Sequence, residues 1–323
     1  MNGGEVQRGL IRLPLGSERV QDADEEVFLL YSKSTSSSDI HRGLGYLDNH
    51  LDTLTLSFEL KSPPLQNSAV VKSKRKSNSR SVQEKTVEIE LAQDKTALRT
   101  RTGDTGSVVW KASIDFAQLV LQQHHAKSPV SILDPEKLRG AHVLELGSGT
   151  GLLSIALSPL VQQYTATDLG ELLPLIRKNL SLNFPGWPHT QTKQGTAMPG
   201  HNVVVEELNW QTLLSTASSR RARLFPRPSP PADLVLIVDC IYHPALLASL
   251  VAAMDFVSTT DSTAVLVVME LRAEDVTREF LERWLTLSSG EWEIWRVGND
   301  EPEGMLAKET PYVMWVGWKS VGD

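Results

Sequence analysis

Short apolar segments alternate with segments of helical spacing over most of the chain after residue 107. Apolar runs bounded by turn residues predict strands, and apolar side chains three or four positions apart predict helices. Strands that alternate with helices form a parallel, doubly wound sheet with helices on both faces. Seven strands are expected, at 141–146, 163–168, 201–210, 233–239, 262–271, 291–297 and 312–318.

The last two predicted strands have no helix between them, so they are expected to pair antiparallel. The predicted fold class is therefore α/β: a doubly wound, mostly parallel seven-stranded sheet with an antiparallel last strand pair, Rossmann-like in its connections. The strand at 233–239 is the most apolar of the set. It is expected at the centre of the sheet, because central parallel strands are buried on both faces.

The N-terminal third of the chain differs from the rest in composition. Segments 50–60 and 85–92 alternate apolar with polar residues, which is typical of half-buried strands. Residues 61–85 between them are polar, serine-rich and basic, so a β-hairpin with a disordered tip is expected. The predicted domains are an N-terminal extension over 1–106 that holds this hairpin, and a main domain over 107–323 with a proline-rich insertion at 217–231.

Composition narrows the class of protein. The 323 residues carry a net charge of −7, which does not favour nucleic acid through bulk electrostatics. Cys240 is the one cysteine, so no internal disulfide forms and a reducing compartment, the cytoplasm or the nucleus, is expected. No apolar run reaches the roughly 18 residues of a membrane helix, and the N-terminus shows no secretory signal. The histidines lack metal-ligand spacing, so no metal site is expected.

A glycine-rich turn follows the first strand of the main domain, in the sequence VLELGSGTGLLSIAL. Glycines there admit a ligand close to the main chain, and Asp168, at the end of the second strand, is placed to bind a ribose. The dinucleotide pattern G-x-G-x-x-G would need glycine where Leu152 stands. Glu145 lies two residues before the first glycine, and its charge would repel a pyrophosphate and suit a cation. S-adenosylmethionine carries a sulfonium and an ammonium and no phosphate, so the pattern favours it over a dinucleotide, although a turn without any ligand remains an alternative.

With these residues the chain resembles a class I, seven-β-strand, S-adenosylmethionine-dependent methyltransferase. Five segments occur in the order found in family 16 protein-lysine methyltransferases: TGSVVWKAS, VLELGSGTGLLSIAL, TATD, EELNW and VDCIYHPALL. The last of them contains the D-x-x-Y motif of that family. The predicted strand pair that leads through LRTRTGDTGSVVW is most similar to the ribosomal lysine N-methyltransferase 5 group.

The resemblance implies a set of site residues, each at a matching position of this sequence. Trp110 is expected to flank the cofactor, and Gly147, Ser148 and Gly149 are expected to contact its methionine part. Asp168 is expected to hold the ribose. Trp210 is expected to pack near the adenine, and Val238 to give a backbone contact near the sulfonium. Trp210 is taken to end the third strand. Asp239 and Tyr242 are expected where cofactor and target lysine meet, with Asp239 holding the incoming ammonium and Tyr242 forming an aromatic wall. The alternatives are a core tryptophan at 110, a helix cap at 168 and simple packing at 242, and Cys240 is given no chemistry.

The implied function is methylation of a lysine in a ribosomal large-subunit protein, with S-adenosylmethionine as cofactor and a protein substrate as partner. A monomer is expected, with no membrane contact and with nucleic acid met only indirectly. Other readings stay open: a translation factor as substrate, a small-molecule or nucleic-acid methyltransferase, and a catalytically idle binding module. A NAD-dependent oxidoreductase is disfavoured by Leu152 and Glu145. The basic stretch 72–80 and the proline-rich insertion have no assigned role.

Overall fold

The structure is a computed structural model. It describes residues 6–34, 52–62, 84–94, 105–188, 198–225, 227–299, 304–307 and 310–320. The predicted disordered tip, apart from its first two and last two residues, and the basic stretch 72–80 lie outside the described residues. Among the described helices, none is long and apolar enough to cross a membrane.

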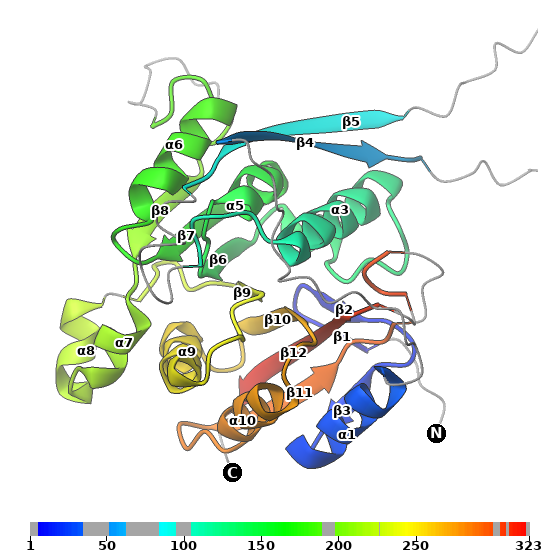
Figure 1. Ribbon diagram of the computed structural model, residues 1–323, viewed down its shortest axis with the longest axis vertical. Coiled ribbons are helices and arrows are strands. Elements are labelled where there is room, and N and C mark those ends of the chain that lie inside the picture. The colour runs from blue at the N-terminus through cyan, green and yellow to red at the C-terminus, as the bar shows by residue number, and fades with distance from the viewer. Residues whose placement is uncertain are drawn as a thin grey trace, which may run out of the picture.

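The core of the molecule is an eight-stranded sheet with the strand order β3-β11-β12-β10-β9-β6-β7-β8 (Figure 1). Strands β10, β9, β6, β7 and β8 run parallel, whereas β12 is antiparallel to both β10 and β11. The predicted doubly wound sheet with an antiparallel last pair is thus confirmed. Its strands are β6 (His142–Leu146), β7 (Gln163–Asp168), β8 (Val203–Glu207), β9 (Leu234–Val238), β10 (Ala264–Glu270), β11 (Glu291–Arg296) and β12 (Tyr312–Ser320).

The eighth strand, β3 (Glu18–Val20), comes from the N-terminal extension and pairs antiparallel with β11. It was not predicted, because three residues are too short for an alternating pattern to stand out. Helix α1 (Ala23–Ser34) follows it and fixes it in place. The buried Glu26 of α1 accepts hydrogen bonds from Arg296 on β11, at 2.6 Å, and from the Trp315 indole on β12, at 2.9 Å.

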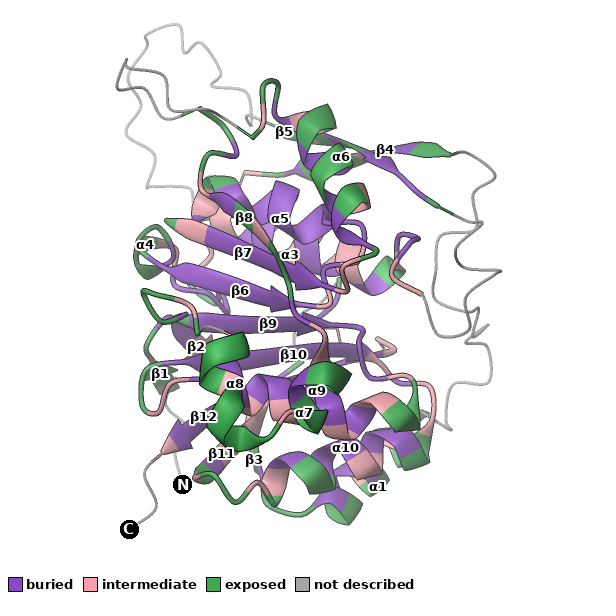
Figure 2. Cartoon of the chain, turned by 90° about the vertical axis from the view of Figure 1, so that its left-hand side faces the viewer, coloured by how far each residue is buried: buried purple, intermediate pink, exposed green. Residues whose placement is uncertain are grey.

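Helices cover both faces of the sheet (Figures 1 and 2). One face carries α3 (Lys111–Ala126), α5 (Leu152–Leu157) and α6 (Leu173–Asn183); the other carries α1, α7 (Trp210–Ser215), α9 (Pro244–Val257) and α10 (Glu274–Leu285). The short helices α4 (Pro135–Leu138) and η1 (Ser158–Leu160) lie in connections. Every residue of β9 is buried, as expected for a central strand with helices on both sides.

The predicted N-terminal hairpin is present as β4 (Thr53–Leu60) and β5 (Lys85–Ala92), which pair antiparallel in register. Side-chain amides attach it to the helices of the main domain. Asn179 of α6 accepts from the Ala92 N–H at 2.7 Å and donates to the Ala92 carbonyl at 3.0 Å, and Asn183 does the same to Glu90. The N-terminal segment also forms a small hairpin, β1 (Val6–Arg8) with β2 (Ile11–Leu13).

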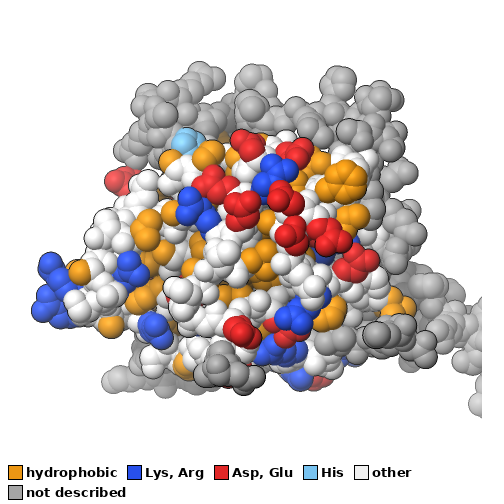
Figure 3. Space-filling view, turned by 90° about the horizontal axis from the view of Figure 1, so that it is seen from below, with side chains coloured by type: hydrophobic (Ala, Val, Ile, Leu, Met, Phe, Trp, Pro, Cys, Tyr) orange, Lys and Arg blue, Asp and Glu red, His pale blue; other side chains and the backbone are white. Residues whose placement is uncertain are grey.

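The region predicted as a proline-rich insertion begins with a helix, α8 (Ser218–Leu224), that has no buried residue. Basic side chains project there at the left of Figure 3, and the arginines of this helix are Arg220, Arg221 and Arg223. Elsewhere in the same view acidic and basic side chains are interspersed. Ion pairs such as Arg278 with Asp24 join α10 to α1.

Candidate active site

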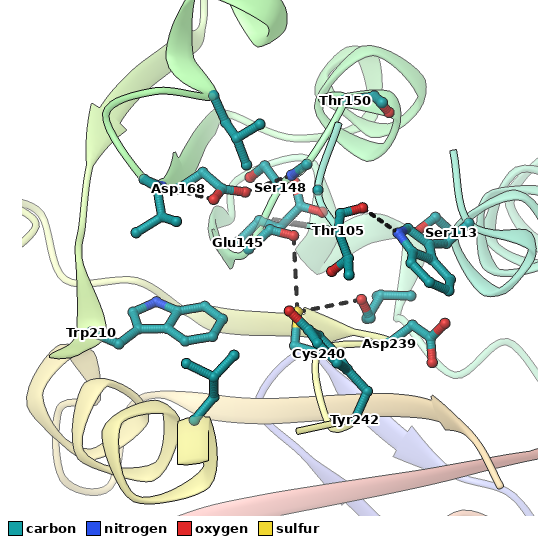
Figure 4. Close-up of a pocket in the computed structure, with 18 of the residues that line it drawn as sticks. Thr105, Ser113, Glu145, Ser148, Thr150, Asp168, Trp210, Asp239, Cys240 and Tyr242 are labelled. Carbon is teal, nitrogen blue, oxygen red and sulfur yellow. Dashed lines mark hydrogen bonds between the residues drawn. The ribbon is translucent and has the colours of Figure 1, made fainter. Parts of the chain in front are cut away.

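A pocket of about 490 Å³ opens at the carboxyl ends of β6, β7 and β9. Ligand sites of open α/β sheets lie at this edge, and the volume is in the usual range for small-molecule sites. The structure brings all nine predicted site residues to the lining of this pocket: Trp110, Gly147, Ser148, Gly149, Asp168, Trp210, Val238, Asp239 and Tyr242. Figure 4 shows Asp168 and Ser148 on one side of it, with Trp210 and Tyr242 facing them from the other. The roles assigned to these residues stay predictions.

The three glycines of the turn are required by the backbone itself. Gly147, Gly149 and Gly151 have φ angles of 76°, 54° and 78°, in the left-handed region that favours glycine. A Cβ on Gly147 would lie 2.7 Å from the Cys240 sulfur and 3.2 Å from the Trp210 ring. The N–H groups of Gly147 and Ser148 both donate to the Thr167 carbonyl at 3.0 Å. These two donors are therefore turned toward β7 and do not form a phosphate cradle.

Asp168 ends β7 and is buried beside the turn. Its Oδ2 accepts from the Gly149 N–H at 2.7 Å, and its Oδ1 accepts from the Leu169 N–H at 2.7 Å. A carboxylate is an acceptor only, with about four lone-pair sites on its two oxygens, so its chemistry suits the two hydroxyls of a ribose. Asp168 does not cap α6, whose N-cap is Leu172, so the alternative reading as a helix cap is wrong.

Glu145 lies on β6 with its side chain inside the protein at the base of the pocket. The Tyr164 hydroxyl donates to its carboxylate at 2.9 Å. Burial raises the pKa of Glu145 to about 7, because the ionised form loses its hydration. A cation bound near the turn would favour the ionised form of Glu145 and lower the pKa of its carboxyl. A bound anion would instead repel the ionised carboxylate.

The sequence pattern predicts that Trp210 ends the third strand, and this prediction is wrong. Strand β8 stops at Glu207, and Trp210 is the first residue of α7, whose N-cap Asn209 accepts from the Thr212 N–H at 3.0 Å. Asn209 in ELNWQT is a residue type that favours the N-cap of a helix. The apolar run before it favoured a longer strand in the sequence-based prediction. The ring of Trp210 packs against Gly147, and its buried indole N–H has no hydrogen-bond partner among the described residues.

Asp239 follows β9 and adopts φ 58°, an unusual conformation that aspartate tolerates better than most residues. Its side chain is 1% exposed and is bonded at both oxygens by Arg272, with Oδ1 at 3.0 Å from Nη1 and Oδ2 at 2.6 Å from Nη2. Arg272 also donates to Glu270 at 2.8 Å. In this structure the Asp239 carboxylate is thus already paired with Arg272, and its role toward a substrate ammonium stays a prediction.

Arg272 and Glu270 were not among the predicted site residues. They stand at the end of β10, in the sequence MELRAED, and β10 is the parallel neighbour of β9. A signal was available, because charged residues at the carboxyl ends of adjacent parallel strands meet at one edge of the sheet. The pairing was not recognised, since nothing in the local pattern separates this arginine from a solvated one.

Trp110 is the residue before α3, and its indole donates to the Thr105 carbonyl at 2.9 Å. The Arg272 guanidinium carbon lies 5.3 Å from the centre of the Trp110 ring, within the range of a cation–π contact. Tyr242 is half-buried at the pocket, and Cys240 is buried. Burial, followed by the charges of the nearby carboxylates, raises the pKa of the Cys240 thiol well above its usual value, so the thiol is not a nucleophile here.

The residues of the pocket fit a phosphate-free ligand that carries positive charge and an aromatic base. Four acidic residues line it, Glu145, Asp168, Glu171 and Asp239, of which Asp239 is paired with Arg272. The indole N–H of Trp210, which has no partner among the described residues, is available as a donor. Among the described residues, no group of three or more His, Cys, Asp or Glu side chains could hold a metal ion.

One family model covers most of the main domain and the end of the N-terminal extension. The model of methyltransferase family 16, described as lysine methyltransferase, matches residues 90–286. This match covers more than half of the chain and includes every residue named above at the pocket. This chain belongs to that family. Membership in this family implies S-adenosylmethionine as the methyl donor, in agreement with the acidic side chains that line the pocket.

Three curated relatives show how far the similarity extends. Protein-lysine methyltransferase METTL21E of Bos taurus is 31% identical over 182 residues, 55% of this chain and 52% of the relative. Ribosomal lysine N-methyltransferase 5 of Candida glabrata is 27% identical over an alignment 327 positions long. This alignment covers 85% of this chain and 93% of the relative. A protein of Schizosaccharomyces pombe named diaminohydroxyphosphoribosylamino-pyrimidine deaminase is 32% identical over 201 residues, but only 41% of it is matched. The chain spans about half the length of several curated relatives it matches.

Proposed function

We propose that this protein transfers a methyl group from S-adenosylmethionine to the side-chain nitrogen of a lysine in a protein. The observation that carries the proposal is the meeting of two sets of residues in one pocket: the glycine turn with Asp168, and the D-x-x-Y pair Asp239 and Tyr242. In our proposal the first set binds the methyl donor and the second set meets the acceptor. The family match supports the reaction class.

The sulfonium donor supplies a methyl group on a good leaving group, so the protein's main task is to position the acceptor. Lysine is mostly protonated at neutral pH, with a reference pKa of ~10.4, and only its neutral amine is a nucleophile. Removal from water, and a nearby cation, both lower that pKa. In our proposal Tyr242 forms the aromatic wall that desolvates and orients the amine, and Trp110 flanks the cofactor. The lysine loses its proton to water before the amine enters.

The proposed substrate is a protein of the large ribosomal subunit, and the proposed compartment is the cytoplasm. Support comes from the Candida glabrata relative named a ribosomal lysine N-methyltransferase, which aligns over 85% of this chain. That alignment extends well beyond the 90–286 match to the family, and so takes in much of the N-terminal extension. We further propose the extension over 1–106 as the part of the chain that distinguishes this group from other family members.

The test combines binding and transfer. Labelled S-adenosylmethionine is added to a methyl-deficient extract with the wild-type protein, with Asp168→Asn and with the control Asp275→Asn, whose side chain is exposed on α10. One labelled ribosomal band, lost with D168N and kept with D275N, is the expected result. Mass spectrometry then identifies the modified lysine.

Calorimetry separates the ways in which this proposal fails. If wild-type protein binds S-adenosylmethionine and labels nothing, the chain is an idle cofactor-binding module. A labelled band that is not ribosomal would contradict the proposed substrate and keep the reaction. If D168N binds S-adenosylmethionine as tightly as wild type does, Asp168 is not the ribose-binding residue.

A further inference from the structure

Beside the cofactor pocket, Arg272 occupies a small cation site made by other parts of the chain. Asp239 supplies the carboxylate and accepts two hydrogen bonds from the guanidinium, at 3.0 and 2.6 Å. Trp110 supplies the aromatic face, 5.3 Å from the guanidinium carbon. These two groups come from the end of β9 and the start of α3, and both also line the pocket.

A carboxylate beside an aromatic face is the chemistry that binds an alkylammonium ion. A protonated lysine side chain that entered the pocket would therefore be drawn to the place that Arg272 now fills. The guanidinium holds this place more firmly than an ammonium would, because it forms two parallel hydrogen bonds with one carboxylate and sheds its hydration more easily. The ion pair is largely closed to solvent, since the side chains of Arg272 and Asp239 are 24% and 1% exposed.

The charged groups packed near Arg272 leave one negative charge beside the ion pair. Glu270 on β10 accepts from the same guanidinium and has a side chain that is 12% exposed. On α3, Lys111 and Asp115 pair with each other, and Asp115 also accepts from the Tyr312 hydroxyl at the start of β12. Arg272 thus neutralises one of its two carboxylate partners, and Glu270 carries the remaining charge.

We infer that Arg272 is an internal occupant of a cation site, through which the pocket rejects a protonated lysine and admits the neutral amine. This inference rests on the proposed function for its consequence, but the site itself is testable without any transfer. Arg272 is a positioning and specificity-determining residue in this account. It does not touch the reacting atoms, and it keeps the Asp239 carboxylate from holding the substrate in its unreactive form.

Removal of the side chain should leave a site that an added cation can fill. Arg272→Ala is expected to unfold at a lower temperature than wild type and to regain about 2–4 °C in millimolar methylguanidinium or n-butylammonium. Wild type should gain nothing, because its site is filled. The double variant R272A/D239N should also gain nothing, since it lacks the carboxylate. Arg283→Ala, which removes an exposed ion pair with Glu279 on α10, is the matched control.

If R272A and R283A respond alike to the two cations, the inference is overturned. Should R272A fail to fold, Arg272→Ser leaves the same space open beside Asp239, and the same comparison is made with both cations. A binding measurement with S-adenosylmethionine on wild type runs in parallel. Failure to bind that compound would contradict the proposed function, whereas the cation response decides the site independently.

With the lysine substrate identified, a kinetic signature follows. R272M should bind substrate more tightly at neutral pH and turn it over more slowly, so that KM and kcat both fall. Its rate should also rise at a more alkaline pH than the wild-type rate, because the freed carboxylate stabilises the protonated lysine. A merely structural role for Arg272 would raise KM or leave it unchanged, and it would not shift the pH profile.

Discussion

Gly147 is held by two independent constraints, a positive φ and the packing of Cys240 and Trp210 at the position that a Cβ would occupy. We expect Gly147→Ala to lower the free energy of unfolding by clearly more than about 1 kcal/mol, the usual cost of alanine at positive φ. Gly9→Ala is the control for strain alone, since Gly9 has φ 59° and nothing within 4 Å of a Cβ. Urea unfolding measures both.

A second variant separates the two constraints at this position. Cys240→Ala removes the sulfur that a Cβ on Gly147 would meet at 2.7 Å. The cost of G147A should therefore be smaller in a C240A background than in wild type. Equal costs in the two backgrounds would mean that strain, and not the close approach, requires glycine there.

Glu145 predicts a pH dependence of stability. The pKa of this carboxyl is raised by burial from 4.5 to about 7 in the folded protein, so folding favours its protonated form. The stability it contributes is fully present below about pH 4.5 and is lost as the pH rises through about 7. The glutamine of Glu145→Gln is neutral at every pH, so this variant does not lose stability in this way. The difference in free energy of unfolding between E145Q and wild type should therefore shift in favour of E145Q by roughly 3 kcal/mol between about pH 5 and pH 8.

Unfolding in denaturant at several pH values checks this expectation. Glu136→Gln on α4, whose side chain is 81% exposed, serves as the control. A constant difference between E145Q and wild type across the range would show that Glu145 does not change its protonation on folding.

At the scale of single residues, the resemblance to family 16 named nine site residues, and all nine line the pocket. The glycine turn, Asp168 and the D-x-x-Y motif could also be located from the pattern alone, because each lies at or directly after the end of a predicted strand. Arg272 was not found. Its importance depends on which strand lies next to β10 and on how its guanidinium meets Asp239, and a linear pattern contains neither fact. The same holds for the burial of Glu145, which turns a presumed fixed charge into a group that titrates near neutral pH.

At the scale of elements, long alternating or apolar runs predicted the strands that they form. Short elements, and elements without a buried face, were not predicted. Strand β3 has three residues, and α8 is a helix with no buried face. Neither leaves a periodic signal, because periodicity records the burial of one side of an element. The hairpin β4–β5 was recognisable for the opposite reason, since buried side chains such as Leu54 and Phe58 recur at alternate positions.

The attachment of that hairpin depends on Asn179, which is fully buried on α6. Its amide bonds both the N–H and the carbonyl of Ala92 and also donates to the Thr150 carbonyl of the glycine turn at 2.9 Å. Asn179→Ala leaves these groups without partners, at a cost of about 1–3 kcal/mol for each one that stays buried. We expect a lower unfolding temperature and faster amide exchange in β5.

Ser181→Ala on the same helix is the control for this prediction, because its hydroxyl is at the surface. Amide exchange that rises equally along β5 and α9 in N179A would indicate global destabilisation. In that case Asn179 would not be a local attachment point for the hairpin.

At the scale of the whole molecule, the N-terminal extension is built into the main sheet. Beyond β3, Arg8 pairs with Glu293 at 3.0 Å, and Arg12 pairs with Asp134 at 2.7 Å. Residues of β2, β4 and β5 belong to the same hydrophobic cluster as α3 and α5. These contacts give a physical reason to expect that extension and main domain unfold together.

Calorimetry should accordingly show one unfolding transition, and Glu26→Ala should shift it without splitting it. Glu26 is buried against Arg296, and loss of one partner of such a pair costs about 3 kcal/mol or more. Glu25→Ala, an exposed change next to it, should leave the transition in place. Two resolved transitions in wild type would show that the extension over 1–106 folds as a separate unit.

The amides that hold the β4–β5 hairpin have a further consequence for how copies of this protein behave toward one another. Asn179 and Asn183 occupy outward main-chain groups of β5, and Gln118 and Gln122 of α3 occupy those of Glu59 and Lys61 at the end of β4. An isolated two-stranded ribbon normally offers both its margins to any extended chain it meets. Here parts of both margins are already engaged by helices, so the ribbon is protected against recruiting a neighbour into a growing intermolecular sheet.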